Sequence, residues 1–572
     1  MTRIRFLPVA ALACLAATQP LAAQTFPTAD PVIKRIYALG MDSTQLYREA
    51  HVLFDSLGPR LMGTPNIRRA QGWLVNTYKS WGIDAKEEKY GTWRGWIRGH
   101  SHIDLVAPRV RSLEGQMVAY SPGTNGKDVV RHTIILPRFK DSTEFVKWLP
   151  QAKGKLVLIS APLPTCRSQD QWNVFGTPAS AARMAADVAA VRMEWLSQRA
   201  EPNNPTITGA NAGVRGTGYS SALGGGELGV RLEDGGAGGI ITSRPKLTFS
   251  SGSGGGRGDQ GFGRGRGSSG GVGAMEVFGT YNKKTPAIAL NCEDYGLVYR
   301  LTEAGDKPRL KLNLEGTLLG EQPVFNVVAT VRGSEKPDEY VVLSSHFDSW
   351  DGSSGATDNG TGTLIMLEAM RILHQIYPHP RRTILAGHWS GEEEGDVGST
   401  AFTEDHPEVI KGLMDVFNQD NGTGRIQDIG GGGMKYSPEH INMWLSRIPT
   451  EFKDAVHANV PGGPARGGSD DFSFACHGVP TSGLGTLRWD YGSLTWHTER
   501  DTYDKVVFDD LKFNATFTAM MAYLAAEDPT MIPHIEVDMT PPIGAAAGAP
   551  AGGRGGWAEC EKAPRSTNPR LK

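Results

Sequence analysis

The feature that most constrains the fold is an alternation of strand and helix patterns across residues 323–528. Tyr340-Val-Val-Leu-Ser344 is a short apolar run typical of a strand that is buried on both faces, and residues 364–376 repeat Leu, Met and Ile at helical spacing. Further strands are predicted at residues 383–386 and 414–417, and a closing helix at residues 506–526. This alternation predicts an α/β fold, a three-layer sandwich around a mixed, mostly parallel sheet.

Acidic residues and histidines follow the predicted strands. Because ligands bind in open α/β sheets beyond the carboxyl ends of the strands, we expect these side chains to lie close together. A set of imidazoles and carboxylates without thiolates suits catalytic zinc, although cobalt and manganese accept the same ligands. In chain order the residues are His346, Asp348 and Asp358 after the first strand, Glu392 and Glu393 after the second, Asp420 after the third, and His497 before the closing helix.

The number of carboxylates in this set points to more than one cation. Unpaired carboxylates packed together repel one another and take up protons, and divalent cations remove that cost. Two cations about 3.5–4 Å apart need one carboxylate that bridges them and open positions for a shared water. The sequence therefore predicts a site for two zinc ions rather than a group of solvated loop acids.

These motifs resemble the co-catalytic, two-zinc metallopeptidase family of bacterial aminopeptidases and glutamate carboxypeptidases, with the greatest similarity to the plasma glutamate carboxypeptidase type. The resemblance rests on His346-Phe-Asp-Ser-Trp350, on Arg382-Thr-Ile-Leu385 and on the Glu392-Glu393 pair. It covers residues 323–528 together with the helices near residues 60–65.

The resemblance implies a role for each residue of the set. Glu392 is implied as the catalytic base that takes a proton from the metal-bridging water, and Asp348 as the acid that orients His346. A cis peptide bond is implied between Asp358 and Asn359. The implied metal ligands are His346 and Asp420 for one zinc, Glu393 and His497 for the other, and Asp358 as the bridge.

One stretch departs from the family pattern. Some family aminopeptidases carry a carbonyl-polarising tyrosine a few residues before a Ser-Asp-His element. The matching stretch here is Arg466-Gly-Gly-Ser469-Asp470-Asp471, which has neither that tyrosine nor the histidine. We hypothesise that Arg466 binds the oxyanion or a substrate carboxylate, and a solvent-facing loop arginine is the alternative.

The favoured function is hydrolysis of short peptides or dipeptides at a chain end by a dizinc exopeptidase. The sequence leaves the end open. A free amino terminus needs nearby acids, for which Asp351, Glu394 and Asp471 are candidates, whereas a free carboxylate needs Arg466 or another cation. The alternatives are a glutaminyl cyclase-like enzyme with one zinc and a non-catalytic, receptor-like relative, and the full set of five ligands argues against both.

The net charge of the chain indicates which partners are excluded, and its first residues indicate the compartment. The chain of 572 residues has 59 Lys and Arg against 61 Asp and Glu, so no net charge favours nucleic acid as a partner. Arg3 and Arg5 precede an apolar run and small residues, the pattern of a signal peptide over residues 1–23. No later run is apolar enough to span a membrane. We expect an exported protein, periplasmic or secreted, and a homodimer is left open.

Changes in composition predict several domains. Short apolar runs separated by turn residues predict a β-rich insert that resembles a protease-associated domain. The tail is low in complexity and is expected to be disordered. The predicted ranges are 24–112 for the N-terminal part of the peptidase domain, 113–316 for the insert, with a helical insertion at 164–225 and a Gly/Arg-rich tract at 250–273, 317–530 for the catalytic domain, and 541–572 for the tail.

Four cysteines follow the predicted signal peptide: Cys166, Cys292, Cys476 and Cys560. They are far apart in the sequence and form no Cys-x-x-Cys pair, so a thiolate zinc site is not expected. One disulfide is compatible with an exported protein, but the sequence does not choose the pair.

Overall fold

The computed structural model describes residues 28–137, 139, 142–167, 169–199, 228–243, 282–463, 468–538 and 559–567. The signal peptide predicted at residues 1–23, the Gly/Arg-rich tract at 250–273 and Arg466 lie outside these ranges. Within them, none of the helices combines the length and the apolar composition that a bilayer-spanning helix requires.

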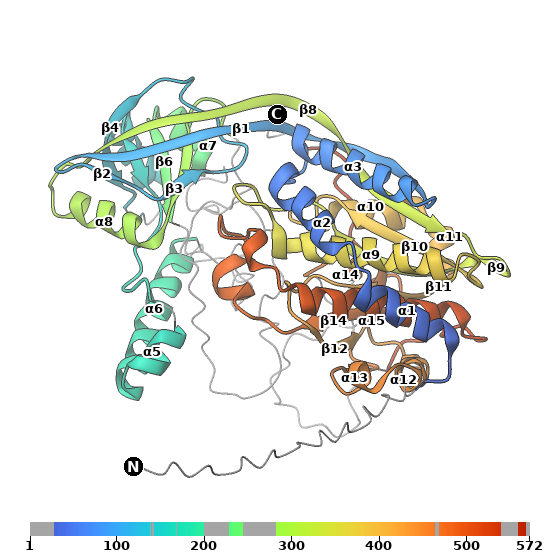
Figure 1. Cartoon of the computed structure of the whole chain (residues 1–572). Helices are drawn as coiled ribbons and strands as arrows, with labels where there is room; N and C mark the ends of the chain where they lie inside the picture. The colour runs from blue at the N-terminus through green and yellow to red at the C-terminus, as the bar shows by residue number, and fades with distance from the viewer. Residues whose placement is uncertain are drawn as a thin grey trace, which may run out of the picture.

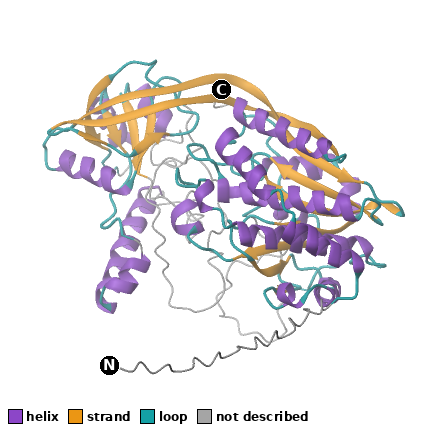
Figure 2. Cartoon of the chain, in the orientation of Figure 1, coloured by secondary structure: helices purple, strands orange, loops and turns teal. Residues whose placement is uncertain are grey.

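A mixed sheet forms the centre of the larger body of the molecule (Figures 1 and 2). The central strands β14, β11, β9 and β10 are parallel, and so are β12 and β13, whereas β1, β8 and the β12–β14 pair are antiparallel. This arrangement confirms the predicted α/β fold. The strand order is β13 (His457–Asn459), β12 (Ile426–Gly431), β14 (Thr481–Thr486), β11 (Leu413–Asn418), β9 (Lys336–His346), β10 (Arg382–Trp389), β8 (Arg309–Val331) and β1 (Asp84–Ala107).

Helices cover both faces of this sheet. Successive side chains of a strand point to opposite faces, so Val341 and Leu343 of β9 join one apolar core while Val342 joins another. The sheet is therefore the middle of three layers. One face packs against α1 (Pro31–Asp42), α2 (Leu46–Ala50), α3 (Pro65–Ser80), α9 (Thr361–Ile376), α12 (Ser437–Arg447), α13 (Thr450–Lys453) and α15 (Phe508–Glu527), and the other against α10 (Val397–Asp405), α11 (Pro407–Lys411) and α14 (Asp471–Ala475).

Side-chain caps explain where several helices begin. Thr64 accepts a hydrogen bond from the backbone nitrogen of Ile67 (3.4 Å) at the start of α3, where Pro65 takes the first position. Asn291 accepts one from the backbone nitrogen of Asp294 (2.8 Å) at the start of α8 (Cys292–Glu303). Such caps satisfy backbone donors that have no partner inside the helix.

A second, smaller sheet lies at the far end of β1 and β8 (Figure 1). Its strands β4 to β7 are parallel and β3 is antiparallel, and α4 (Ser142–Trp148), α7 (Leu228–Asp234) and α8 pack on it. This region therefore alternates strands and helices, and its resemblance to a protease-associated domain stays a prediction. The strand order is β4 (Val129–Ile135), β5 (Leu156–Leu158), β6 (Gly239–Ser243), β7 (Ala287–Leu290) and β3 (Gly115–Met117).

Two long strands connect the bodies. β1 and β8 pair from Asp84 with Thr330 to Ala107 with Arg309, and β2 (Arg111–Ser112) pairs with the end of β1. Since the same strands contribute to both sheets, residues of β1 contact both bodies. The helices α5 (Gln169–Phe175) and α6 (Pro178–Arg199) project from the smaller body (Figure 1).

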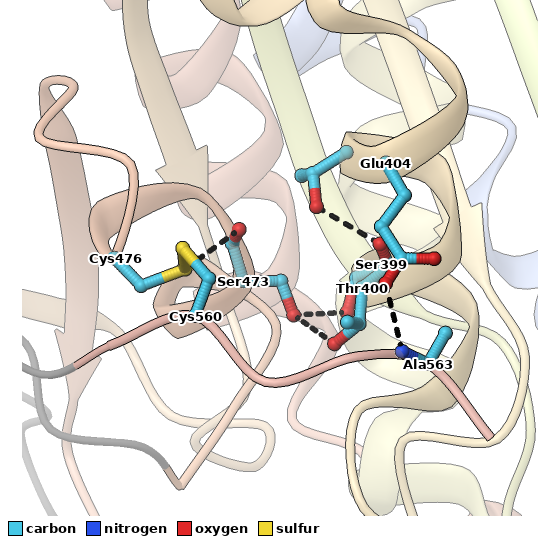
Figure 3. The surroundings of a disulfide bond; sticks show 8 residues. Ser399, Thr400, Glu404, Ser473, Cys476, Cys560 and Ala563 are labelled. Carbon is cyan, nitrogen blue, oxygen red and sulfur yellow. Dashed lines mark hydrogen bonds between the residues drawn. A yellow bond between two sulfur atoms is a disulfide. The ribbon is translucent and has the colours of Figure 1, made fainter.

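Part of the predicted tail packs on the larger body (Figure 3). Cys560 forms a disulfide with Cys476, just after α14, and Arg565 forms ion pairs with Glu404 and Asp405 of α10. The prediction of disorder is therefore wrong for residues 559–567, because average composition conceals such specific contacts.

The structure contains two disulfides where the sequence suggested one. The second joins Cys166 to Cys292, the first residue of α8. The paired cysteines are 126 and 84 residues apart in the sequence, so only the folded chain reveals the pairing.

Candidate metal centre

Strand β9 ends at His346, whose side chain is fully buried at the carboxyl edge of the sheet. Its Nδ1 lies 3.1 Å from the carbonyl oxygen of Asp348. An Nδ1–H that donates to this carbonyl leaves the lone pair of Nε2 as the ligand. Nε2 lies 3.3 Å from Asp420 Oδ1 and 3.5 Å from Asp358 Oδ1. Asp420 follows β11, the neighbour of β9, so the order of strands brings these residues together.

Glu393 and His497 form a second group with Asp358. His497 Nε2 lies 2.9 Å from Glu393 Oε2 and 3.3 Å from Asp358 Oδ2. Asp358 therefore directs one carboxyl oxygen toward His346 and the other toward His497. The peptide bond between Asp358 and Asn359 is cis, as the resemblance implied.

The donor atoms of these groups suit bound cations. At this edge of the sheet, two sets have ligand atoms within 4.8 Å of one another: His346, Glu392 and Asp420, and Asp358, Glu393 and His497. A third set elsewhere, Cys476, His477 and Cys560, contains the Cys476–Cys560 disulfide and so has no free thiolate. Asp358 Oδ2 and Glu393 Oε1 are buried and lack a hydrogen-bond partner among the described residues. A buried carboxyl oxygen without a partner is costly unless a cation binds it. Imidazole and carboxylate ligands fit zinc.

Crowding also shifts the pKa values of the acids. Burial raises the pKa of Glu393 well above its usual range, and Asp358 adds to the effect. Burial likewise raises the pKa of Glu392 well above its usual range, against the lowering effect of His346, and repulsion from Asp420 adds to the rise. A divalent cation among these groups would favour their ionised forms.

Asp348 holds the loop that follows β10. Its two carboxyl oxygens accept hydrogen bonds from the backbone nitrogens of Glu392 (3.3 Å) and Glu393 (3.2 Å). Its Oδ1 also lies 3.6 Å from Nδ1 of His346. The resemblance implied an orienting role toward His346 alone, whereas the structure connects Asp348 to both glutamates as well. Glu392 Oε2 lies 3.9 Å from His346 Nε2, at the edge of the first group.

Arg60 is a buried arginine to which sequence reasoning gave no role. Its guanidinium donates hydrogen bonds to the carbonyl oxygens of Phe347, Ser354 and Gly355. These contacts hold the loop between His346 and Asp358. Burial lowers the pKa of Arg60 to about 10, so the side chain stays charged at neutral pH.

Asp501 and Tyr491 were also missed. Asp501 accepts hydrogen bonds from the backbone nitrogens of Thr357 (2.7 Å) and Asp358 (3.0 Å). The hydroxyl of Tyr491 donates to Asp358 Oδ1 at 3.0 Å. Both residues therefore fix Asp358, and no sequence motif marks either of them.

Two of the acids considered for binding an amino terminus have other partners. Asp351 forms an ion pair with Arg98 of β1, and Glu394 accepts a hydrogen bond from the hydroxyl of Tyr120 (2.9 Å). Asp471 is the first residue of α14; burial raises its pKa to about 6, and the charge of Asp420 adds to the shift.

Known proteins share this architecture. Residues 326–523 match the model of peptidase family M28. Carboxypeptidase Q of Rattus norvegicus is 23% identical over 499 residues, which cover 86% of this chain and 88% of that protein. A peptidase M28 precursor from Shewanella amazonensis has a similar fold, with a TM-score of 0.59, 21% identity, and coverage of 89% of this chain and 98% of that one. The zinc aminopeptidase BSAP from Bacillus subtilis has a TM-score of 0.50, 16% identity, and coverage of 86% and 98%.

The fold, the donor set and these matches together identify the chain as a zinc metallopeptidase. The segment that matches the model of peptidase family M28 carries every residue of the two donor groups.

Proposed function

We propose that the chain is a dizinc exopeptidase that hydrolyses short peptides or dipeptides at a chain end. The observation that carries the proposal is the position of Asp358, whose Oδ1 lies 3.5 Å from His346 Nε2 while its Oδ2 lies 3.3 Å from His497 Nε2. A carboxylate between two ligand groups is what a pair of cations requires. In this proposal His346 and Asp420 hold one ion, Glu393 and His497 hold the other, and Asp358 binds both.

Zinc in such a site supplies a polarised scissile carbonyl and a water of lowered pKa. Glu392 is the base: its carboxylate removes a proton from the attacking water and delivers it to the leaving amine. Asp348 keeps Glu392 in place through the backbone nitrogen to which it is hydrogen-bonded (3.3 Å). The distance of 3.9 Å between Glu392 Oε2 and His346 Nε2 supports this role, because a base must lie close to the water that it deprotonates.

Whether the enzyme cleaves at the amino or the carboxyl end of a peptide depends on which charged groups can bind the terminal charge of the substrate. The relatives named above include a carboxypeptidase and an aminopeptidase, so their names support cleavage at a chain end without choosing it. Asp351 forms an ion pair with Arg98, and Glu394 accepts a hydrogen bond from Tyr120. For cleavage at the amino end, we therefore propose that Asp471 binds the ammonium group of the substrate.

Matched peptides test this function. A tripeptide is compared with its N-acetylated and its C-amidated forms, using the zinc-loaded protein and measuring kcat/KM. An exopeptidase loses most of its activity on one blocked form and keeps it on the other. Equal cleavage of both blocked forms would show an endopeptidase. Asp471→Asn should raise KM more than it lowers kcat if the free amino group is the one required.

We also propose that the protein is exported. The disulfides Cys166–Cys292 and Cys476–Cys560 support this, because disulfides persist mainly in oxidising compartments. The signal predicted at residues 1–23 gives the expected route. Fractionation of cells that produce the full chain, with mass spectrometry of its N-terminus, tests the proposal; an unprocessed chain in the cytoplasm would contradict it.

A further inference from the structure

The ring of His497 is held by aromatic stacking. His497 lies on the loop between the helical turn η6 (Tyr491–Thr495) and α15, and its φ is +58°, a backbone conformation that few residues other than glycine adopt. Trp350 stacks on one side of the ring, with centroids 4.4 Å apart and planes 11° apart. Trp496 also stacks on the ring, with centroids 3.8 Å apart and planes 24° apart. Two indole faces therefore fix the plane of the imidazole and the direction of Nε2.

Trp350 is held in turn through the next residue. Asp351 forms an ion pair with Arg98, and the two side chains are 5% and 17% exposed. Arg98 also donates a hydrogen bond to the carbonyl oxygen of Met117 (2.6 Å), and its guanidinium lies 4.9 Å from the centre of the Trp96 ring. These contacts leave Arg98 little freedom, so Asp351 is fixed to the strand that leads to the smaller body.

The residue after Asp351 is confined as well. Gly352 has a φ of +101°, and a Cβ atom added there would lie 2.1 Å from Oε1 of Gln116. The loop that carries Trp350 is therefore enclosed by the segment around β3, which includes Gln116 and Met117. A contact path runs from the smaller body through Arg98, Asp351 and Trp350 to the ligand His497.

We propose that Arg98 and Asp351 position the ring of His497 through Trp350, and thereby set the zinc affinity of the site formed by Glu393 and His497. These are positioning residues, because none of them belongs to the ligand groups. The inference rests on the proposed dizinc function. The proposal gives a functional role to Arg98 on strand β1, which connects the smaller body to the body that contains the candidate metal centre. Groups that orient a metal-binding histidine typically contribute ten- to a hundredfold to affinity.

Zinc titration of the metal-free full chain against a chromophoric chelator tests the inference, because it resolves two binding steps without using activity. Trp350→Leu removes the stacked ring, whereas Trp350→Phe keeps an aromatic face. Arg98→Met removes the ion pair. Arg111→Met is its matched control, because Arg111 pairs with the buried Asp294 at 2.8 Å on the smaller body, away from the ligand groups.

We expect Trp350→Leu and Arg98→Met to weaken one zinc-binding step roughly tenfold and to leave the other within about twofold. Trp350→Phe and Arg111→Met should stay close to the wild type in both steps. Equal weakening of both steps, or no change in either, would overturn the positioning role. If Arg98→Met fails to fold, the comparison of Leu with Phe at position 350 decides the question.

The outcome separates this inference from the proposed function. A wild-type chain that binds a single zinc would overturn the dizinc function. The positioning role would then be judged on that single step: it stands if Trp350→Leu weakens the step more than Trp350→Phe does, and fails if the two variants are alike.

Discussion

The two halves of the candidate metal centre are built on different kinds of backbone. One half, called the strand half, contains His346 and Asp420. His346 is the last residue of β9, and Asp420 follows β11, which pairs with β9 through Asn418 and Ser344. The other half, called the loop half, contains Glu393 and His497, which lie on loops and are oriented by side-chain contacts, several of them from other segments. Asp358 belongs to both halves.

The difference shows how each half is held in place. Backbone hydrogen bonds of the sheet fix the ends of β9 and β11, so the strand half follows from the fold itself. The loop half depends on side chains that come from distant segments, such as Asp348 and Trp350. We therefore expect changes outside the ligands to affect the loop half more than the strand half.

The largest effect should come from Glu392→Gln. Glutamine cannot accept the proton, so kcat should fall by about 10³-fold while both zinc ions remain bound. Turnover and zinc content are measured on the same preparation, with Glu439→Gln on the exposed part of α12 as the control. Loss of one zinc in Glu392→Gln would show that Glu392 is a metal ligand of the strand half. Such a role is compatible with the structure, because Glu392 lies in the first donor group with His346 and Asp420.

Removal of single ligands should separate the halves. His497→Ala should reduce the bound zinc from about two to about one ion per chain, because the strand half keeps His346, Asp420 and Asp358. Asp358→Ala should weaken both ions, because Asp358 belongs to both halves. Zinc content after dialysis against a weak chelator measures this. Loss of both ions in His497→Ala would mean that the halves do not bind independently.

The tail disulfide should affect stability without affecting zinc. The double variant Cys476→Ser/Cys560→Ser frees residues 559–567 from α14, and the loss of a long disulfide loop costs roughly 3–4 kcal/mol. The thermal midpoint of the peptidase body should fall, whereas zinc content should not change. Cys166→Ser/Cys292→Ser, which opens the disulfide of the smaller body, is the matched comparison. Zinc loss in Cys476→Ser/Cys560→Ser but not in Cys166→Ser/Cys292→Ser would contradict this expectation. It would show that the tail helps to hold the ligands of the strand half in place.

The smallest effect concerns Asp415, which lies within β11 beneath the strand half. Burial raises its pKa to about 7, although the hydroxyl of Ser482 and the backbone nitrogen of Val416 donate to it (2.8 and 2.9 Å). The folded chain thus retains a proton that the unfolded chain releases near pH 4, so stability from this group is full below about pH 4 and is lost as the pH rises to about 7.

Asp415→Asn removes this titration. The thermal midpoint of the variant relative to wild type should therefore rise by a few degrees between about pH 4.5 and pH 8, and then level off. A difference that stays constant across this range would show that Asp415 is not protonated in the folded chain.

The strand half was largely predictable from the sequence, because apolar runs mark β9, β10 and β11 and the polar residues follow directly. Asp358 and His497 were candidates by their positions near a strand and a helix, but their ligand roles were implied only by the resemblance, because neither residue directly follows a strand. Residues 559–567 of the tail were mispredicted because Cys560 and Arg565 stand in a stretch whose composition is otherwise uninformative.

The supporting contacts could not have been predicted in this way. Arg60 lies 295 residues from Gly355, to which it donates a hydrogen bond, and Asp501 lies 143 residues from Asp358. The stacking of Trp350 on His497 likewise joins distant segments. Such contacts depend on the folded arrangement of loops, about which hydrophobic periodicity carries no information.

The most direct test of the account is anomalous diffraction at the zinc edge, from crystals of the zinc-loaded chain. The account predicts two peaks per chain, one bonded to His346 and Asp420 and the other to Glu393 and His497, with one oxygen of Asp358 bonded to each. A single peak, or two peaks of which Asp358 touches only one, would contradict it.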